Sequence, residues 1–159
     1  MNALLDILRS NALETKDNIA KMLGVSSAEV AEEIRKLEEA GVIRGYQAIV
    51  NEDLVEQKRV TAVIEVRVTP ERNGGFDRLA NRVSKFPEVD AVYLMSGGYD
   101  LMIFITGDDL RGVARFVSEK LSTIEGVLST STHFQLKAYK RDRVLMSEED
   151  GDSRLCVCP

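Results

Sequence analysis

The sequence predicts an α+β protein made of two small domains, a helical one over residues 1–50 and a mixed one over residues 60–140. Apolar residues recur at helical spacing through the first 40 positions, whereas several later segments alternate apolar and polar residues as strands do. The chain has 159 residues, of which 44% are hydrophobic and 30% charged, values typical of a globular protein and sufficient for two small cores.

The first domain begins with three short predicted helices. A stripe of leucines predicts a helix over residues 2–10. Thr15 is placed to cap a second helix, which Gly24 ends. Ser26, followed three residues later by Glu29, forms a capping box that opens the third helix.

Gly41 closes the third helix, and the run VIRGYQAIV at residues 42–50 is expected to form a strand. Three short helices, with a glycine turn between the second and the third and a strand after them, are the pattern of a winged helix-turn-helix domain. Residues 51–59 are mostly polar and lack sheet alternation, so they are expected to be a linker.

The second domain has the predicted order βαββαβ, which is that of a ferredoxin-like fold. The strand RVTAVIEVRV comes first, and a helix over residues 71–86 follows it. Two strands then flank Gly97 and Gly98, a hairpin signal. A helix over residues 108–123 and the strand GVLSTSTHFQLKAY complete the order, and residues 141–159 are expected to be a charged tail.

The composition excludes several classes of protein. A net charge of −5 and a pI of about 5.0 argue against a protein that coats nucleic acid without specificity. No apolar run is long enough to cross a membrane and the N-terminus lacks signal-peptide features, so the expected location is cytoplasmic.

No arrangement of residues suggests catalysis, a metal site or a cofactor. The chain has one histidine, His133, and two cysteines, Cys156 and Cys158, which cannot supply a four-ligand zinc site. There is no nucleophile-and-base grouping and no phosphate-binding glycine loop. A non-enzymatic protein without cofactors is therefore expected.

Residues 1–140 resemble the Lrp/AsnC, or feast/famine, family of transcription regulators. The resemblance rests on the run LEEAGVIRGY at residues 37–46, on FPEVDAVYLMSGGYDLMIFI and on IEGVLSTSTHFQLK, which occur in the family's order. It implies an N-terminal domain that binds double-stranded DNA and a C-terminal domain that binds a small effector, usually an amino acid. It also implies a homodimer that assembles into octamers or larger discs.

The third helix is unusual for a DNA-reading helix because it is acidic. Residues 1–45 hold six Lys and Arg but eight Asp and Glu. Glu29 is expected to be used in the cap, Glu32 to pair with Arg35, and Glu33 to pair with Arg9 or Lys16. The residues left to contact DNA are Lys16, Lys21, Ser26, Ser27, Ala28, Ala31, Arg35, Lys36 and Arg44.

The stretch MSGGYDLM is the candidate effector site. The amides of Gly97 and Gly98 can hold a carboxylate, and Asp100 can accept from an α-amino group. The resemblance adds an opposite wall from the last strand. The expected site is Ser96, Gly97, Gly98, Tyr99, Asp100, Thr130, Ser131 and Thr132. The alternative is a plain hairpin in which Asp100 satisfies its own turn.

Two other functions are compatible with the same scaffold. The sirohaem decarboxylases resemble it, but they need histidine and arginine around a haem-sized pocket, and this chain has only His133. An effector-binding assembly that has lost DNA binding fits the acidic third helix, although the cap, the turn glycine and the Arg35-Lys36 pair oppose it.

Overall fold

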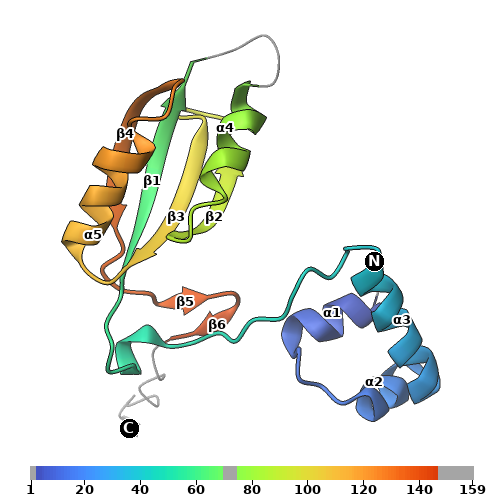
Figure 1. Cartoon of the computed structure of the whole chain (residues 1–159). Helices are drawn as coiled ribbons and strands as arrows, with labels where there is room; N and C mark the ends of the chain where they lie inside the picture. The colour runs from blue at the N-terminus through green and yellow to red at the C-terminus, as the bar shows by residue number, and fades with distance from the viewer. Residues whose placement is uncertain (1–2, 70–74, 147–159) are drawn as a thin grey trace, which may run out of the picture. The chain divides into compact units, whose positions relative to one another are not determined.

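A computed structural model describes residues 3–69 and 75–146, and the chain divides after residue 49 into two compact units (Figure 1). Each unit has its own apolar core, one among the three N-terminal helices and one between the sheet and the helices of the second unit. Within the described residues, no helix is long and apolar enough to span a membrane.

The first unit contains the three predicted helices. Its helices are α1 (Ala3–Ser10), α2 (Lys16–Leu23) and α3 (Ser27–Glu39). The Thr15 side chain accepts from the Asn18 amide to cap α2, and Gly24 ends α2 in the left-handed conformation at φ 69°. The buried core residues of the unit are Leu4, Ile19, Ala20 and Val30.

The capping box that opens α3 is present, as predicted. The Ser26 hydroxyl accepts from the Glu29 amide at 3.2 Å, and a Glu29 carboxylate oxygen accepts from the Ser26 amide at 2.8 Å. At the other end, the Val42 amide donates to the Leu37 carbonyl across Gly41, which has φ 69°. Glycine suits this position because a side chain there would be strained.

The strand predicted over residues 42–50 is absent. In the described part of the first unit only helices surround this segment, and a strand forms only where a neighbouring strand pairs with its backbone. The segment predicted as a linker contains a short 3₁₀ turn, η1 (Glu52–Leu54), capped by the Asn51 side chain.

The second unit is a four-stranded antiparallel sheet with helices on one face. Its strands are β1 (Val60–Val68), β2 (Val89–Leu94), β3 (Leu101–Gly107) and β4 (Val127–Phe134), in the spatial order β2-β3-β1-β4. The helices are α4 (Gly75–Val83) and α5 (Leu110–Arg115), the latter continued by a π-helical segment, η2 (Phe116–Leu121). This is the predicted ferredoxin-like order.

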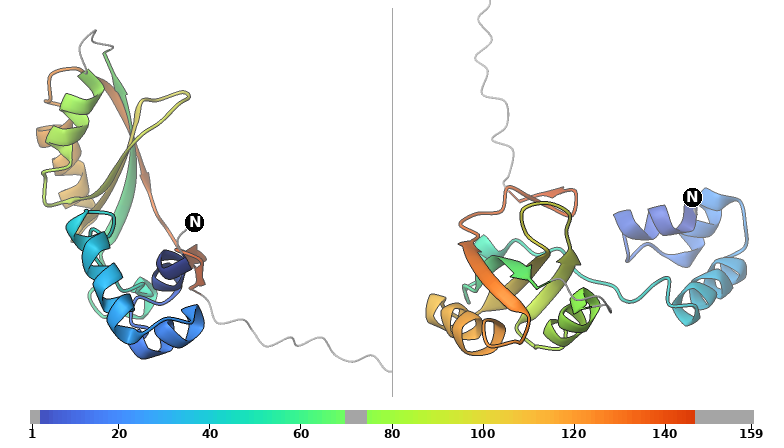
Figure 2. Two further views of the ribbon diagram at one scale, coloured as in Figure 1. Left: turned by 90° about the vertical axis from the view of Figure 1, so that its right-hand side faces the viewer. Right: turned by 90° about the horizontal axis from the view of Figure 1, so that it is seen from above.

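Both helices lie on the same side of the sheet, as Figure 2 shows. Alternate residues of β1 point toward them and are fully buried, including Ala62, Ile64 and Val66. In the described part of this unit, no helix covers the other face, on which Glu65 is half-buried and Arg67 exposed.

The final strand is shorter than predicted, and a hairpin follows it. β5 (Lys140–Arg141) pairs with β6 (Val144–Leu145) around a turn in which Asp142 and Arg143 have φ 45° and 74°. The Asn51 side chain donates to the Met146 carbonyl at 2.7 Å and ties this hairpin to the segment before β1. The rest of the predicted tail, with Cys156 and Cys158, lies outside the described residues.

Candidate DNA-binding surface and ligand site

The glutamates of α3 are largely engaged within the first unit. Glu29 closes the capping box, and the Ser26 amide and hydroxyl lower the pKa of its carboxyl. Glu38 accepts from the Tyr46 hydroxyl at 2.9 Å, and partial burial together with this carboxylate raises the pKa of Tyr46. Glu33 makes no ion pair among the described residues, and its predicted partner Arg9 lies 3.6 Å from Asp6 instead.

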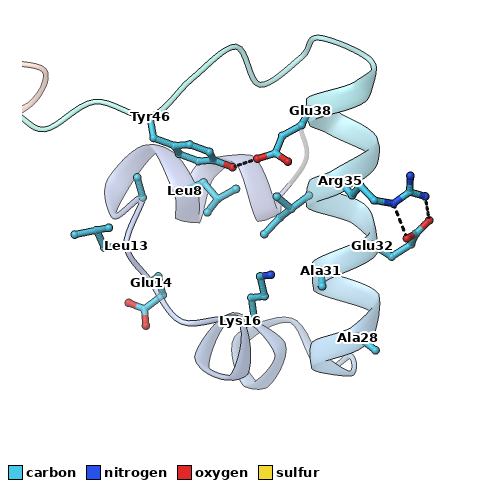
Figure 3. A pocket seen from close by; sticks show the side chains of 12 residues that line it. Leu8, Leu13, Glu14, Lys16, Ala28, Ala31, Glu32, Arg35, Glu38 and Tyr46 are labelled. Atoms are coloured by element: carbon cyan, nitrogen blue, oxygen red, sulfur yellow. Dashed lines mark hydrogen bonds and ion pairs between the residues drawn. The ribbon is translucent and has the colours of Figure 1, made fainter.

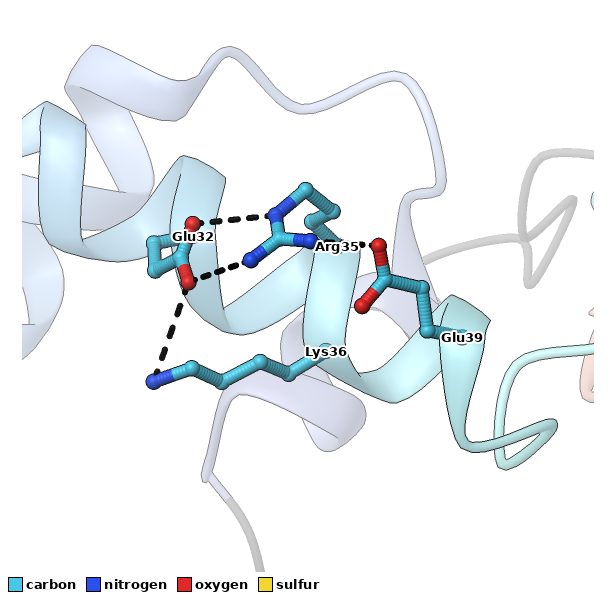
Figure 4. A network of polar contacts seen from close by, with 4 residues as sticks. All are labelled: Glu32, Arg35, Lys36 and Glu39. Atoms are coloured by element: carbon cyan, nitrogen blue, oxygen red, sulfur yellow. Dashed lines mark hydrogen bonds and ion pairs between the residues drawn. The ribbon is translucent and has the colours of Figure 1, made fainter.

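Arg35 is held between two carboxylates on the exposed side of α3 (Figure 4). Its Nε donates to Glu32 Oε2 at 3.0 Å and its NH2 to Glu32 Oε1 at 2.7 Å, while its NH1 donates to Glu39. These hydrogen bonds lower the pKa of Glu32 and raise that of Arg35. The predicted Glu32–Arg35 pair is confirmed, and Glu39 is a partner that the sequence interpretation missed.

The other predicted DNA contacts are less constrained. Lys16, Lys21 and Arg44 are exposed. The Lys36 ammonium lies 3.9 Å from Glu32, and its side chain is 61% exposed. Ser26 is committed to the cap, whereas Ser27 and Ala31 are half-buried and Ala28 is exposed. Exposed cations therefore remain on α2, on α3 and after α3.

A hollow of about 800 Å³ lies between α1, α2 and α3 (Figure 3). Leu8, Ile34 and Tyr46 are among the residues that line it, and Lys16 lies at its edge. Its lining mixes apolar side chains with charged ones, and among the charged residues Glu32, Arg35 and Glu38 are already engaged in hydrogen bonds.

In the turn between β2 and β3, Gly97 but not Gly98 adopts a positive φ, and the Asp100 carboxylate has a structural role that was not predicted. Gly97 has φ 145°, a conformation that side chains rarely adopt. The Asp100 Oδ2 accepts from the Val68 amide at 2.8 Å, and the Asp100 amide donates to the Val66 carbonyl at 3.0 Å. The Asp100 carboxylate thus binds the end of β1, while the Asp100 carbonyl closes the turn by accepting from the Met95 amide at 2.8 Å.

Arg67 is a residue of this region that the sequence interpretation missed. Its Nε donates to the Gly98 carbonyl at 2.9 Å, so a β1 side chain holds the β2–β3 turn. The alternation of β1 places Arg67 on the face of the sheet opposite the core. That alternation was the only signal in the sequence that could have pointed to it.

The three β4 residues expected to line the ligand site do not all lie on the same face of the sheet. Thr130 and Thr132 pair with the buried Val66 and Ile64, whereas Ser131 pairs with Glu65 on the uncovered face. Successive strand residues point to opposite faces, so the three side chains do not form one surface. Only Thr130 shares a β1 neighbour, Val66, with Asp100.

His133 lies on the uncovered face of the edge strand β4. Its Nε2 is 3.3 Å from the Ser131 hydroxyl and 3.5 Å from Glu65, and its side chain is 58% exposed. Across the part of the chain that the structure describes, no group of three or more His, Cys, Asp and Glu side chains is placed to hold a metal ion.

Both units match known families. Residues 2–44 match the family model of a winged helix-turn-helix DNA-binding domain, and residues 61–145 match that of the Lrp/AsnC ligand binding domain. An uncharacterized HTH-type transcriptional regulator of Bacillus subtilis, YugG, is 47% identical over 157 residues, which cover 98% of this chain and 95% of that protein.

Two further relatives have more informative names. The proline dehydrogenase transcriptional activator of Rhodobacter capsulatus is 31% identical over 135 residues, covering 85% of this chain and 87% of the relative. A crystal structure of a transcriptional regulator of Neisseria meningitidis in complex with L-Met is 25% identical, with a TM-score of 0.68 and coverage of 87% and 88% of the two chains.

Proposed function

The chain belongs to the Lrp/AsnC family of transcriptional regulators, and we propose that its first unit binds operator DNA through α2 and α3 while its second unit binds an amino acid that changes this binding. The observation that carries the DNA-binding part is the α2–turn–α3 geometry, with both helices capped and Gly24 between them in the left-handed conformation. We propose no catalytic role for any residue.

The exposed cations provide the contacts to the DNA backbone. Lys16 and Lys21 on α2, Lys36 on α3 and Arg44 beyond it face phosphates, while the start of α3 at Ser27 presents its amides to an anion. Because Arg35 is neutralised, each unit supplies few phosphate contacts. The affinity of one unit is therefore low, and the affinity of a dimer or octamer comes from several units acting together.

The β2–β3 turn is the proposed site for the amino-acid effector. The Neisseria regulator was crystallised with L-Met, which supports an amino acid as the class of ligand. The amides around Gly97 and Gly98 hold the carboxylate. In the described residues the Asp100 Oδ1 accepts no hydrogen bond, so it is available to an α-ammonium group. Ser96, Tyr99 and Thr130 complete the proposed surroundings, whereas Ser131 lies on the opposite face of β4 from Thr130 and Thr132.

The uncovered sheet face supports the proposed homo-oligomer. Tyr93 of β2 pairs with Met102, which pairs with Glu65 of the uncovered face, and it is 54% exposed there with its ring edge-on to that of Phe104. Exposed apolar side chains on one small sheet are stabilised when a second chain covers them.

A protein that binds chromosomal DNA works where the chromosome is, and a cytoplasmic location is part of the proposal.

The test is selection of genomic DNA fragments by the purified protein at low and near-physiological salt, with and without a mixture of amino acids. We expect enrichment of one shared, roughly palindromic site that changes when the amino acids are added. Lys16→Gln with Lys21→Gln should lower the slope of log affinity against log salt by about 2 per subunit. The control, Lys58→Gln with Lys85→Gln in the second unit, has the same change in charge.

Absence of enrichment at either salt concentration contradicts DNA binding. In that case the neutralised Arg35 favours the second candidate, an effector-binding assembly without DNA binding. Enrichment that does not change when the amino acids are added contradicts only the proposal that an amino acid regulates DNA binding.

A further inference from the structure

The guanidinium of Arg35 is the most constrained cation of the reading helix. Arginine has five N–H donors, and three of those of Arg35 are used by Glu32 and Glu39. The two carboxylates come from opposite directions along α3, three residues before Arg35 and four residues after it. Two N–H donors therefore remain in a guanidinium whose orientation is already set.

The surrounding charge decides to which acceptors those two N–H groups can donate. Glu32, Arg35 and Glu39 together carry a charge of −1, which Lys36, 3.9 Å from Glu32, brings to zero. A phosphate that approaches Arg35 is repelled by both carboxylates. Guanine has no net charge, so the carboxylates repel it less, and its acceptors O6 and N7 match paired N–H donors of arginine.

We infer that Arg35 reads a guanine edge rather than a phosphate, and that Glu32 and Glu39 are the positioning residues that impose this choice. The inference rests on the proposed DNA-binding function and adds the base that α3 selects. Under this assignment Arg35 contributes to specificity and not to the salt dependence of binding, because only phosphate contacts release counterions.

The other glutamates of α3 make the assignment specific. Glu29 is used in the cap and Glu38 by Tyr46, so neither contacts Arg35. Glu33 is adjacent to Glu32 and has the same charge, but it makes no ion pair among the described residues. Glu33 is therefore a matched control for Glu32 and Glu39.

The experiment compares the full-length protein and its variants on two duplexes over a range of salt, one carrying the selected site and one unrelated in sequence. Arg35→Ala should lower the ratio of the two affinities, selected over unrelated, about 10-fold or more and leave the salt slope unchanged, because the lost unit charge weakens binding to both duplexes alike whereas the lost base contact weakens only one. The wild-type protein should show a similar loss when 7-deazaguanine, which lacks N7, replaces one guanine of the site. The affinity of the Arg35→Ala variant should not change when that guanine is replaced.

The charge variants test the role of the carboxylates. Glu32→Gln and Glu39→Gln should each tighten binding to the unrelated duplex about fivefold, the effect of one unit charge at about 4 Å in water. The ratio of the two affinities should therefore fall in both. Glu33→Gln should change the ratio little.

Two results would overturn the inference while DNA binding stands. One is an Arg35→Ala variant that loses affinity equally on both duplexes, with a salt slope lower by about 0.9, which identifies a phosphate contact. The other is an equal effect of Glu33→Gln and Glu39→Gln, which identifies general electrostatics. A wild-type protein that binds neither duplex overturns the proposed function as well.

Discussion

Replacing Asp100 by alanine should destabilise the second unit as well as remove its response to amino acids. Its carboxylate accepts from the Val68 amide at 2.8 Å, where β1 meets the turn, and Val68 is 4% exposed. A hydrogen bond to a charged group contributes about 1.5–3 kcal/mol, and the amide left without a partner adds to the loss. We expect the free energy of unfolding to fall by about 2 kcal/mol, which corresponds to roughly 10 °C in Tm for a unit of this size.

The measurement is urea or thermal unfolding of the full chain followed by far-ultraviolet circular dichroism. The control is Asp90→Ala, because within the described residues the exposed Asp90 carboxylate accepts only from the Thr106 hydroxyl, at 2.7 Å. Its loss should cost about 0.5 kcal/mol. If Asp100→Ala costs no more than this control, the carboxylate does not hold the end of β1.

The conservative variant Asp100→Asn separates stability from ligand binding. Asparagine keeps an oxygen that can accept from the Val68 amide but loses the negative charge that an α-ammonium group needs. We expect stability within about 1 kcal/mol of wild type and no effect of amino acids on DNA binding. A normal amino-acid response in this variant would exclude Asp100 from the effector site.

Two other predictions concern one unit each. Ser26→Ala should lower the stability of the first unit by about 1 kcal/mol in urea unfolding because it removes the cap of α3, whereas Ser27→Ala, next to it and outside the capping box, should change it little; equal effects would refute the role of the box. The ammonium of Lys120 holds the pKa of the Glu88 carboxyl below its ordinary value of 4.5, so the stability that this pair adds is complete above about pH 4.5 and is lost as the pH falls through the lowered pKa. In unfolding experiments between about pH 6 and pH 3, the free energy of unfolding of the wild type should therefore exceed that of Glu88→Gln by less as the pH falls. A difference between the two that does not depend on pH would contradict this.

Local signals in the sequence predicted the helices of the first unit well. A cap depends on residues three or four positions apart, so Thr15, Ser26, Glu29 and Gly24 were enough to place the ends of α2 and α3. Pairing of strands depends on distant segments, and for that reason the strand predicted over residues 42–50 was wrong.

The candidate ligand site was harder to predict, for two different reasons. The bond from Val68 to Asp100 spans 32 residues, and no local pattern indicates it. The division of Thr130 and Ser131 between faces was accessible, because successive residues of any strand alternate. The family resemblance placed Thr130 and Ser131 on one side of the ligand site because they are neighbours in the sequence.

The pairing within α3 changes how its acidity bears on DNA binding. Counting charges suggests a helix that repels phosphate, but Arg35 and Lys36 balance Glu32 and Glu39, and Glu29 is held in the cap. Glu29, Glu33 and Glu38 nevertheless leave α3 with a net charge of −3, from two cations against five glutamates, so a single α3 binds DNA weakly. We therefore expect occupancy of an operator to depend on how many first units reach it together, since avidity multiplies weak contacts. A ligand that changes the assembly of the second units then controls binding without touching the DNA-binding surface.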